Sequence, residues 1–435
     1  MKRLTISLIA LLGGLLIAGI STPPTTAAAP TPANPTALPC DPQNGIQPSG
    51  AIYRICMPLP NRYNGQLIIW AHGYVNPDEP LHIPEDQLCP FEDGPCINDI
   101  ANVLGFGFAT TSYRKNGLAI KEGIQDILEL IDLYAAQEGT PDRIFLIGAS
   151  EGGIITALMT ENYPDILAGG LSMCGPIGDF FQQVNYFGDF RALYTYFYPG
   201  NFPVMPVVPF PLYVYGMNHF DEYYEAKWWP SIMEGGPSKM WELIQTAQIP
   251  YDPMDFDTSI EQSIHDLFRY NVYAANDAAY TLGSFANPAQ PFDNMDRVYS
   301  GSLDDATLNA EIARVAADPE AVAEIEAYYQ TSGELQIPLV TLHTTLDQQV
   351  PYWHETLYQA KIDAAGSNDH YFHIAVDRYE HCNFTPEEAL LAFAKMIIMA
   401  NGDAPTMAEL MTLLPNQAAQ ADWHRLAEQY QLHLR

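Results

Sequence analysis

Short apolar runs of strand length alternate with amphipathic helical segments along two stretches of the chain. Between the apolar runs, residues 98–104 predict a short helix, and apolar residues recur at helical spacing from Ile120 to Tyr134. A repeated strand–helix alternation is typical of a parallel sheet with helices on both faces, so the pattern predicts an α/β fold with a mostly parallel sheet. The predicted strands are 66–71, 106–111, 143–148, 168–173, 337–343 and 371–376.

This alternation breaks between residues 175 and 335. The block begins with many aromatic residues from Phe180 to Tyr198 and later indicates helices over 259–273 and 304–329. Because it is inserted between two strands of the sheet, we expect a mostly helical cap over the edge at which the parallel strands end. Most of its aromatic residues are expected to form the cap's own core, and a few to line an apolar cleft. The predicted parts are a core at 40–174 and 336–400, the cap at 175–335 and a C-terminal helical tail at 401–435.

The sequence Gly148-Ala149-Ser150-Glu151-Gly152 lies between a predicted strand and a helical segment. Strand, G-x-S-x-G and helix together are the context of a nucleophile elbow, a turn so tight that glycine is needed on both sides of the serine. Such a turn lifts the serine hydroxyl out of the sheet at the positive end of a helix. The pattern therefore predicts Ser150 as a nucleophile rather than as part of a glycine-rich loop.

A serine nucleophile needs a base and an acid that orients the base, and after such an elbow the acid precedes the histidine along the chain. Asp347 lies on a loop just past the strand at 337–343, and His381 lies on a loop past the strand at 371–376. Both loops follow strand ends, as Ser150 does. The sequence thus predicts Ser150, Asp347 and His381 as a catalytic triad.

Other residues of the same types compete for these roles. Asp179 follows the strand after the elbow and is the second candidate for the acid. His343 and His373 lie inside strand patterns, which favours packing roles, and His354 is expected to open a helix.

The oxyanion formed in acyl transfer needs backbone N–H donors, and His72-Gly73-Tyr74 follows a buried strand at a suitable place. The predicted donors are the N–H groups of Tyr74 and of Glu151, the residue after the nucleophile. The alternative is that His72-Gly73 is an ordinary turn that ends the strand.

These motifs together resemble the α/β-hydrolases over about residues 50–175 and 335–400. Asp347-Gln348-Gln349-Val350-Pro351 is similar to the D-x-x-V-P segment of esterases and prolyl-oligopeptidase-like peptidases. His381-Cys382 resembles the H-C pair of tannases and feruloyl esterases, in which that cysteine is bonded to one beside the nucleophile. Here Ala149 precedes the serine, so the chain departs from that group at this position. The resemblance implies an α/β-hydrolase fold and serine hydrolase chemistry, which needs no cofactor or metal.

The beginning of the chain has the pattern of a secretory signal. Met1-Lys2-Arg3 is followed by an apolar run from Leu4 to Ile20 and then by small residues, which predicts a signal peptide over 1–29. An uncleaved anchor is the alternative, because the run is marginal for a bilayer span. Residues 30–39 are expected to be a disordered linker. We expect a secreted or extracytoplasmic protein, with no stable membrane insertion after signal cleavage.

Six cysteines in an exported chain indicate three disulfides, although sequence does not fix their connectivity. A zinc site is not favoured, because the chain has no C-x-x-C pair and its histidines are irregularly spaced. A bridge between Cys174 and Cys382 would clamp the loop that carries His381. Spacing favours the pairs Cys40 with Cys56, Cys89 with Cys96, and Cys174 with Cys382.

Composition narrows the class of protein further. The 52 acidic and 19 basic residues give a net charge of −33, which argues against a nucleic-acid partner. Hydrophobic residues make up 48% of the chain, enough for a large core.

The sequence predicts a secreted serine hydrolase that acts on a small-molecule or polymeric carboxylic ester with bulky apolar or aromatic groups. The alternative is a serine exopeptidase of the prolyl-oligopeptidase-like type, in which Glu222 or Glu225 could bind a peptide N-terminus. A third possibility is a catalytically inactive binding protein on the same fold. The acyl and alcohol groups and the oligomeric state are not determined by the sequence.

Overall fold

The computed structural model describes residues 45–91, 95–201, 220–272, 274–284, 287–402, 407–414 and 416–430. The predicted signal peptide at 1–29, the predicted linker at 30–39 and Cys40 lie outside these ranges. In the part of the chain that is described, no helix combines the length and the apolar character needed to span a bilayer.

The described residues contain a sheet of eight strands in the order β1-β2-β4-β3-β5-β6-β7-β8. Every neighbouring pair from β4 to β8 is parallel, whereas β2 pairs antiparallel with both β1 and β4. The parallel strands therefore all end at the same edge of the sheet. The strands are β1 (Gly45–Ile46), β2 (Ile52–Cys56), β3 (Gln66–Ala71), β4 (Gly107–Thr111), β5 (Arg143–Ala149), β6 (Gly169–Met173), β7 (Leu339–Leu346) and β8 (Tyr371–Tyr379).

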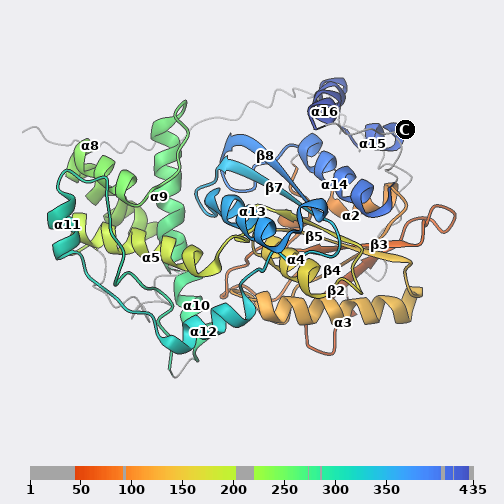
Figure 1. Cartoon of the computed structure of the whole chain (residues 1–435), viewed down its shortest axis with the longest axis horizontal. Helices are drawn as coiled ribbons and strands as arrows, with labels where there is room; N and C mark the ends of the chain where they lie inside the picture. The colour runs from red at the N-terminus through yellow and green to blue at the C-terminus, as the bar shows by residue number, and fades with distance from the viewer. Residues whose placement is uncertain are drawn as a thin grey trace, which may run out of the picture. The chain divides into compact units, whose positions relative to one another are not determined.

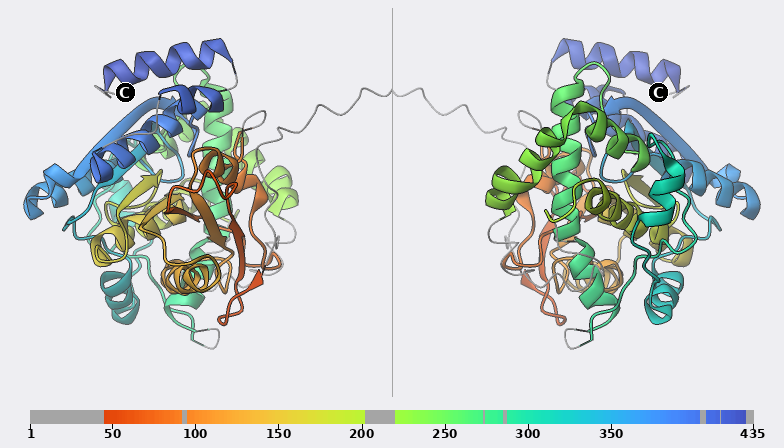
Figure 2. Two further views of the ribbon diagram at one scale, coloured as in Figure 1. Left: turned by 90° about the vertical axis from the view of Figure 1, so that its right-hand side faces the viewer. Right: turned by 90° about the vertical axis from the view of Figure 1, so that its left-hand side faces the viewer.

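Helices cover both faces of this sheet (Figures 1 and 2). The sheet separates two apolar layers of the core. Alternate residues of a strand point to opposite faces, so each central strand supplies both layers. One layer is closed by α3 (Ile120–Glu138), α4 (Glu151–Asn162) and α13 (Trp353–Ala365). The other is closed by α1 (Glu85–Leu88), α2 (Ile97–Val103), α14 (Pro386–Asn401), α15 (Met407–Leu413) and α16 (Gln417–Gln429).

The segment between β6 and β7 is mostly helical where it is described, and its helices α5, α8, α9 and α11 lie together beside the sheet (Figure 1). Its aromatic and aliphatic residues form a third apolar cluster of their own. We call this segment, residues 175–335, the cap. Its helices are α5 (Phe180–Phe197), α7 (Phe220–Tyr223), the π-helical η1 (Tyr224–Trp228), α8 (Trp229–Thr246), α9 (Phe256–Val272), α10 (Ala274–Leu282), α11 (Asp305–Glu311) and α12 (Pro319–Tyr328).

Several elements differ from the prediction; strand β7, for example, spans Leu339–Leu346 rather than 337–343. The aromatic block after Asp179 forms one long helix, α5. The helical pattern over 304–329 is two helices, and the second begins with Pro319 at a position where the missing N–H costs nothing. Strand β8 continues past residue 376 to Tyr379. Because β8 is the edge strand, the polar residues Asp377 and Arg378 reach solvent without leaving the sheet.

Candidate active site

Ser150 lies at the turn between β5 and α4, with a positive φ of 57° and ψ of −119°. A non-glycine residue in this region is strained, which is the usual state of an elbow serine. The two flanking glycines are required by space: a Cβ at Gly148 would overlap the Gly152 carbonyl, and a Cβ at Gly152 would overlap the Ala71 carbonyl. The local sequence therefore folds as the predicted elbow.

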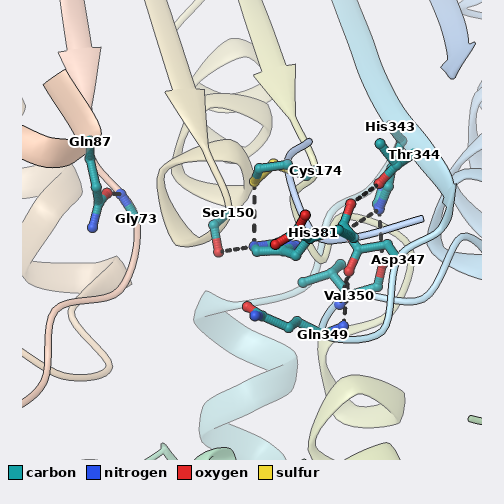
Figure 3. Close-up of a disulfide and its surroundings, with 12 residues drawn as sticks. Gly73, Gln87, Ser150, Cys174, His343, Thr344, Asp347, Gln349, Val350 and His381 are labelled. Carbon is teal, nitrogen blue, oxygen red and sulfur yellow. Dashed lines mark hydrogen bonds and ion pairs between the residues drawn. A yellow bond between two sulfur atoms is a disulfide. The ribbon is translucent and has the colours of Figure 1, made fainter. Parts of the chain in front are cut away.

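The structure brings His381 and Asp347 to Ser150, as Figure 3 shows. The Nε2 atom of His381 lies 2.9 Å from Ser150 Oγ, and its Nδ1 atom lies 2.7 Å from Asp347 Oδ2. Asp347 is fully buried, and the His381 side chain is 11% exposed. The serine hydroxyl can thus donate to an imidazole whose other nitrogen donates to a buried carboxylate.

Both carboxylate oxygens of Asp347 are used. Oδ1 accepts hydrogen bonds from the backbone N–H groups of Gln349 (2.9 Å) and Val350 (2.8 Å). The loop therefore positions the carboxylate independently of His381. Burial alone would raise the pKa of Asp347, but the neighbouring His381 and His343 outweigh it and hold that pKa well below the ordinary value. The carboxylate is therefore ionised across the working pH range.

A second buried histidine lies behind Asp347, and the sequence did not indicate this arrangement. His343 Nε2 is 2.9 Å from the Val350 carbonyl and 3.3 Å from Asp347 Oδ2, while its Nδ1 is 3.0 Å from Glu355 Oε1. Both ring nitrogens face acceptors, which favours the doubly protonated imidazolium. Burial would lower the pKa of His343, but its bonds to Asp347 and Glu355 dominate and raise it to about 10.

The network continues through Glu355 to the edge strand. Glu355 Oε2 accepts from Thr341 Oγ1 (2.9 Å) and Tyr371 Oη (3.0 Å), and it lies 3.1 Å from His373 Nδ1. His343 sits in β7, as its strand pattern predicted, but it also contacts the candidate acid.

The competing residues have other partners. Asp179 caps α5, where its carboxylate accepts from the Gln182 N–H (3.1 Å) and from Gln330 Nε2 (2.8 Å). His354 is fully buried near the start of α13 and accepts from the Gly178 N–H through Nδ1 (3.0 Å). Asp347, and not Asp179, therefore contacts His381.

The predicted oxyanion loop is held by a side chain that the sequence did not single out. The Gly73 N–H donates to Gln87 Oε1 at 2.6 Å, and Gln87 Nε2 donates to the Tyr74 carbonyl at 3.3 Å. Gln87 thus bonds the Gly73 N–H and the Tyr74 carbonyl, the backbone groups that precede and follow the Tyr74 N–H. Figure 3 shows Gln87 against Gly73. Glu151, the other predicted donor, is the first residue of α4, and burial raises the pKa of its carboxyl to about 8.

Two disulfides lie close to these loops. Cys174, directly after β6, is bonded to Cys382 beside His381, and Cys89 is bonded to Cys96. Both pairings were predicted, whereas the predicted partner of Cys56, Cys40, lies outside the described residues. Among the described residues the metal-type ligands that cluster are Cys174, His381 and Cys382, and two of these are joined in the disulfide.

Two cavities meet at Ser150. The larger, of about 510 Å³, lies within the usual size range of small-molecule sites. It is lined mainly by strands β3, β5 and β6 and by helices α2 and α14, and its lining residue from the cap is Tyr270. The smaller, of about 90 Å³, lies under the cap against Phe180, Phe187 and Tyr270. A few cap aromatics thus line a cleft at Ser150, but the larger space is inside the core.

The antiparallel β2, the parallel strands after it and the serine turn after β5 define the α/β-hydrolase fold, as the sequence predicted. No protein-family model matches this sequence, and no curated protein matches it.

Solved structures of hydrolases are similar to the chain. Feruloyl esterase B from Aspergillus oryzae is 13% identical, with a TM-score of 0.41 over 83% of this chain and 81% of that one. An esterase from Pyrococcus furiosus is 11% identical, with a TM-score of 0.39 over 81% and 88%. An acylaminoacyl peptidase from Pyrococcus horikoshii is 12% identical, with a TM-score of 0.37 over 76% of this chain. The chain spans only 35% of the length of that peptidase, and the likeness concerns the fold alone.

Proposed function

We propose that this protein is a serine hydrolase that cleaves carboxylic esters through an acyl-enzyme intermediate. The observation that carries the proposal is the hydrogen-bonded chain from Ser150 through His381 to Asp347, with separations of 2.9 and 2.7 Å. A serine aligned with an imidazole, and an imidazole aligned with a buried carboxylate, are the parts needed to activate a hydroxyl at neutral pH.

In the proposed mechanism, His381 Nε2 takes the Ser150 proton as Oγ attacks the ester carbonyl. Asp347 keeps the Nδ1 proton directed toward itself and stabilises the imidazolium that forms. The N–H groups of Tyr74 and Glu151 stabilise the oxyanion, and each such donor contributes about 3 kcal/mol in well-studied cases. His381 then protonates the leaving alkoxide, and the acyl-enzyme is hydrolysed by a water that His381 activates.

The cavities favour apolar esters over peptides. The larger cavity at Ser150 is lined mainly by apolar side chains, which suits a bulky apolar group. Glu222 and Glu225, which could have bound a peptide N-terminus, are exposed on the cap and line neither of the two cavities at Ser150. The disulfides fit an oxidising compartment, so secretion is part of the proposal.

The test is covalent labelling together with turnover. A fluorophosphonate should label the wild-type protein and not Ser150→Ala, and the wild type should hydrolyse 4-nitrophenyl esters faster than aminoacyl 4-nitroanilides. An unlabelled wild type would support a binding protein on this fold instead. Faster anilide than ester hydrolysis would support the exopeptidase.

A further inference from the structure

We propose that the larger cavity at Ser150 binds a linear aliphatic chain of the substrate, which inserts into the hydrophobic core between the sheet and helices α2 and α14. The inference rests on the proposed ester hydrolysis and names its substrate class. In this proposal the aliphatic chain of the substrate lies in the body of the hydrolase rather than under the cap.

The floor of the cavity is built from aligned rows of the sheet. Ala149 of β5 pairs with Met173 of β6, and both line the cavity next to Ser150. One row deeper, Trp70, Ile147 and Leu171 are register neighbours across β3, β5 and β6. These residues all point to the same face, because two positions separate the rows along each strand. The floor is therefore continuous from the serine downward.

The depth of this floor suits a chain rather than a compact group. Ile68, which lines the cavity, pairs with Phe145 and so lies two rows below Ala149. At about 3.3 Å per residue, this places it about 13 Å along the strands from the Ala149 row. A group that reaches Ile68 from the ester carbonyl must extend over about this distance, which a linear chain of carbon atoms does.

The walls opposite the floor are also apolar. Helix α2 contributes Ile97, Ile100 and Ala101, and helix α14 contributes Ala389, Leu390 and Phe393. The charged side chains of the lining, Asp86 of α1 and Glu380 beside His381, are exposed. Apart from the buried indole N–H of Trp70, the floor and wall residues named above carry no polar side-chain group that donates hydrogen bonds, so a charge carried to the far end would lose its hydration and the cavity favours a hydrocarbon.

The other side of Ser150 limits the second half of the ester. The cavity under the cap holds only about 90 Å³ between residues such as Phe180, Val184 and Ala278. One arm of the ester is therefore long and the other short. The long arm is either the acyl chain or the alcohol chain, and two substrate series distinguish these sources.

The experiment measures kcat/KM for 4-nitrophenyl acyl esters of increasing length and, separately, for acetates of linear alcohols of increasing length. In the series whose chain enters the cavity, we expect kcat/KM to rise about two- to fourfold per methylene up to an optimum length, and to rise no further once the chain outgrows the Ile68 row. Fluorophosphonate titration counts the active sites, so a misfolded fraction does not enter the rate.

Three variants test where the aliphatic chain of the substrate lies. Ala101→Leu fills the cavity from α2 and should move the optimum to shorter chains by several carbons. Phe393→Leu enlarges it and should move the optimum to longer chains, a shift that partial unfolding would not produce. Ala278→Leu, the same change in the small cavity, should keep the optimum of the long series in place.

A labelled, active enzyme with flat or falling rates in both series would overturn the inference and leave the proposed hydrolase intact. Equal optima for Ala101→Leu and Phe393→Leu would overturn it as well. Absence of labelling and of acetate hydrolysis would instead count against the proposed function.

Discussion

Asp347 accepts hydrogen bonds at both of its oxygens, one from backbone N–H groups and the other from His381. The loop thus sets the position of the carboxylate, and the carboxylate sets the tautomer of the histidine. A carboxylate held in this way orients the imidazole without taking up its proton.

The first prediction separates the two candidate acids. Asp347→Asn should lower kcat by about 10⁴-fold, because an amide in this place favours the wrong histidine tautomer. Asp179→Asn is the matched control and should keep near wild-type kcat, since Asp179 caps α5. Steady-state rates of both variants on one 4-nitrophenyl ester, scaled by circular dichroism to the folded fraction, check this. The reverse pattern would assign the acid to Asp179.

A second prediction concerns His343, whose imidazolium lies between Asp347 and Glu355. The pKa of His343 is raised to about 10, so its ion pairs stabilise the fold fully below the ordinary histidine pKa of about 6.5 and progressively less as the pH rises toward 10. In His343→Gln the melting temperature should therefore fall, and its difference from the wild type should shrink between pH 7 and pH 10.

The matched control for His343 is His373→Gln. His373 contacts Glu355 Oε2, 3.1 Å away, but it lies further from Asp347 along the network. The groups that face His343 are Asp347 and Glu355, with His354 nearby. A melting-temperature difference between His343→Gln and the wild type that stays constant from pH 7 to pH 10 would show that His343 only packs.

At the scale of residues, the sequence predicted those whose position follows from the end of a neighbouring strand. Ser150, Asp347 and His381 each follow a recognisable strand, so strand ends alone were enough to bring them together. The contact of His343 with Glu355 depends on how α13 packs on β7, and no spacing in the sequence encodes that. Gln87 was missed for the same reason, because its partner Gly73 belongs to a different element.

At the scale of elements, the loop with His381 is fixed at its base and at its tip. Arg378 at the end of β8 forms a bidentate ion pair with Glu388, which also closes the capping box of α14 with Thr385. Near the tip, Cys382 is bonded to Cys174 after β6. Three elements therefore hold the loop in one position.

This arrangement predicts a separation between activity and folding. Mild reductant, or the double variant Cys174→Ser/Cys382→Ser, should lower kcat about tenfold or more while near-ultraviolet circular dichroism stays native. The reason is that the His381 loop loosens before the core does. The double variant Cys89→Ser/Cys96→Ser controls for general thiol effects. Loss of activity and of tertiary signal at the same reductant concentration would contradict the prediction.

Elements were predicted where the apolar period was strong, and their limits were missed where tertiary position decides. The strand β8 ends later than its apolar run because an edge strand tolerates polar residues. The α5 segment was not predicted as a helix, because aromatic residues occur on all sides of the segment and hide the helical spacing of its apolar positions. The larger cavity could not be predicted, since it depends on space left between α2, α14 and the sheet.

For the whole molecule, repulsion within the net charge of −33 is the main long-range electrostatic contribution to the free energy of folding. Self-repulsion opposes the compact state, and the Debye length falls from about 10 Å at 0.1 M salt to about 3 Å at 1 M. The melting temperature should therefore rise by several degrees as NaCl is raised over this range. Differential scanning calorimetry at constant pH checks this, with KCl as the control for a specific sodium effect. A constant or falling melting temperature would contradict it.

The bond between Cys174 and Cys382 has a sequence separation of 208 residues and joins the two positions that flank the cap, β7, α13 and β8. It makes this part of the chain a covalent ring. A protease that cuts once within the ring opens it but releases neither piece, and the two halves stay joined through sulfur. In an environment rich in proteases, a nicked molecule could then keep Ser150, Asp347 and His381 in one particle.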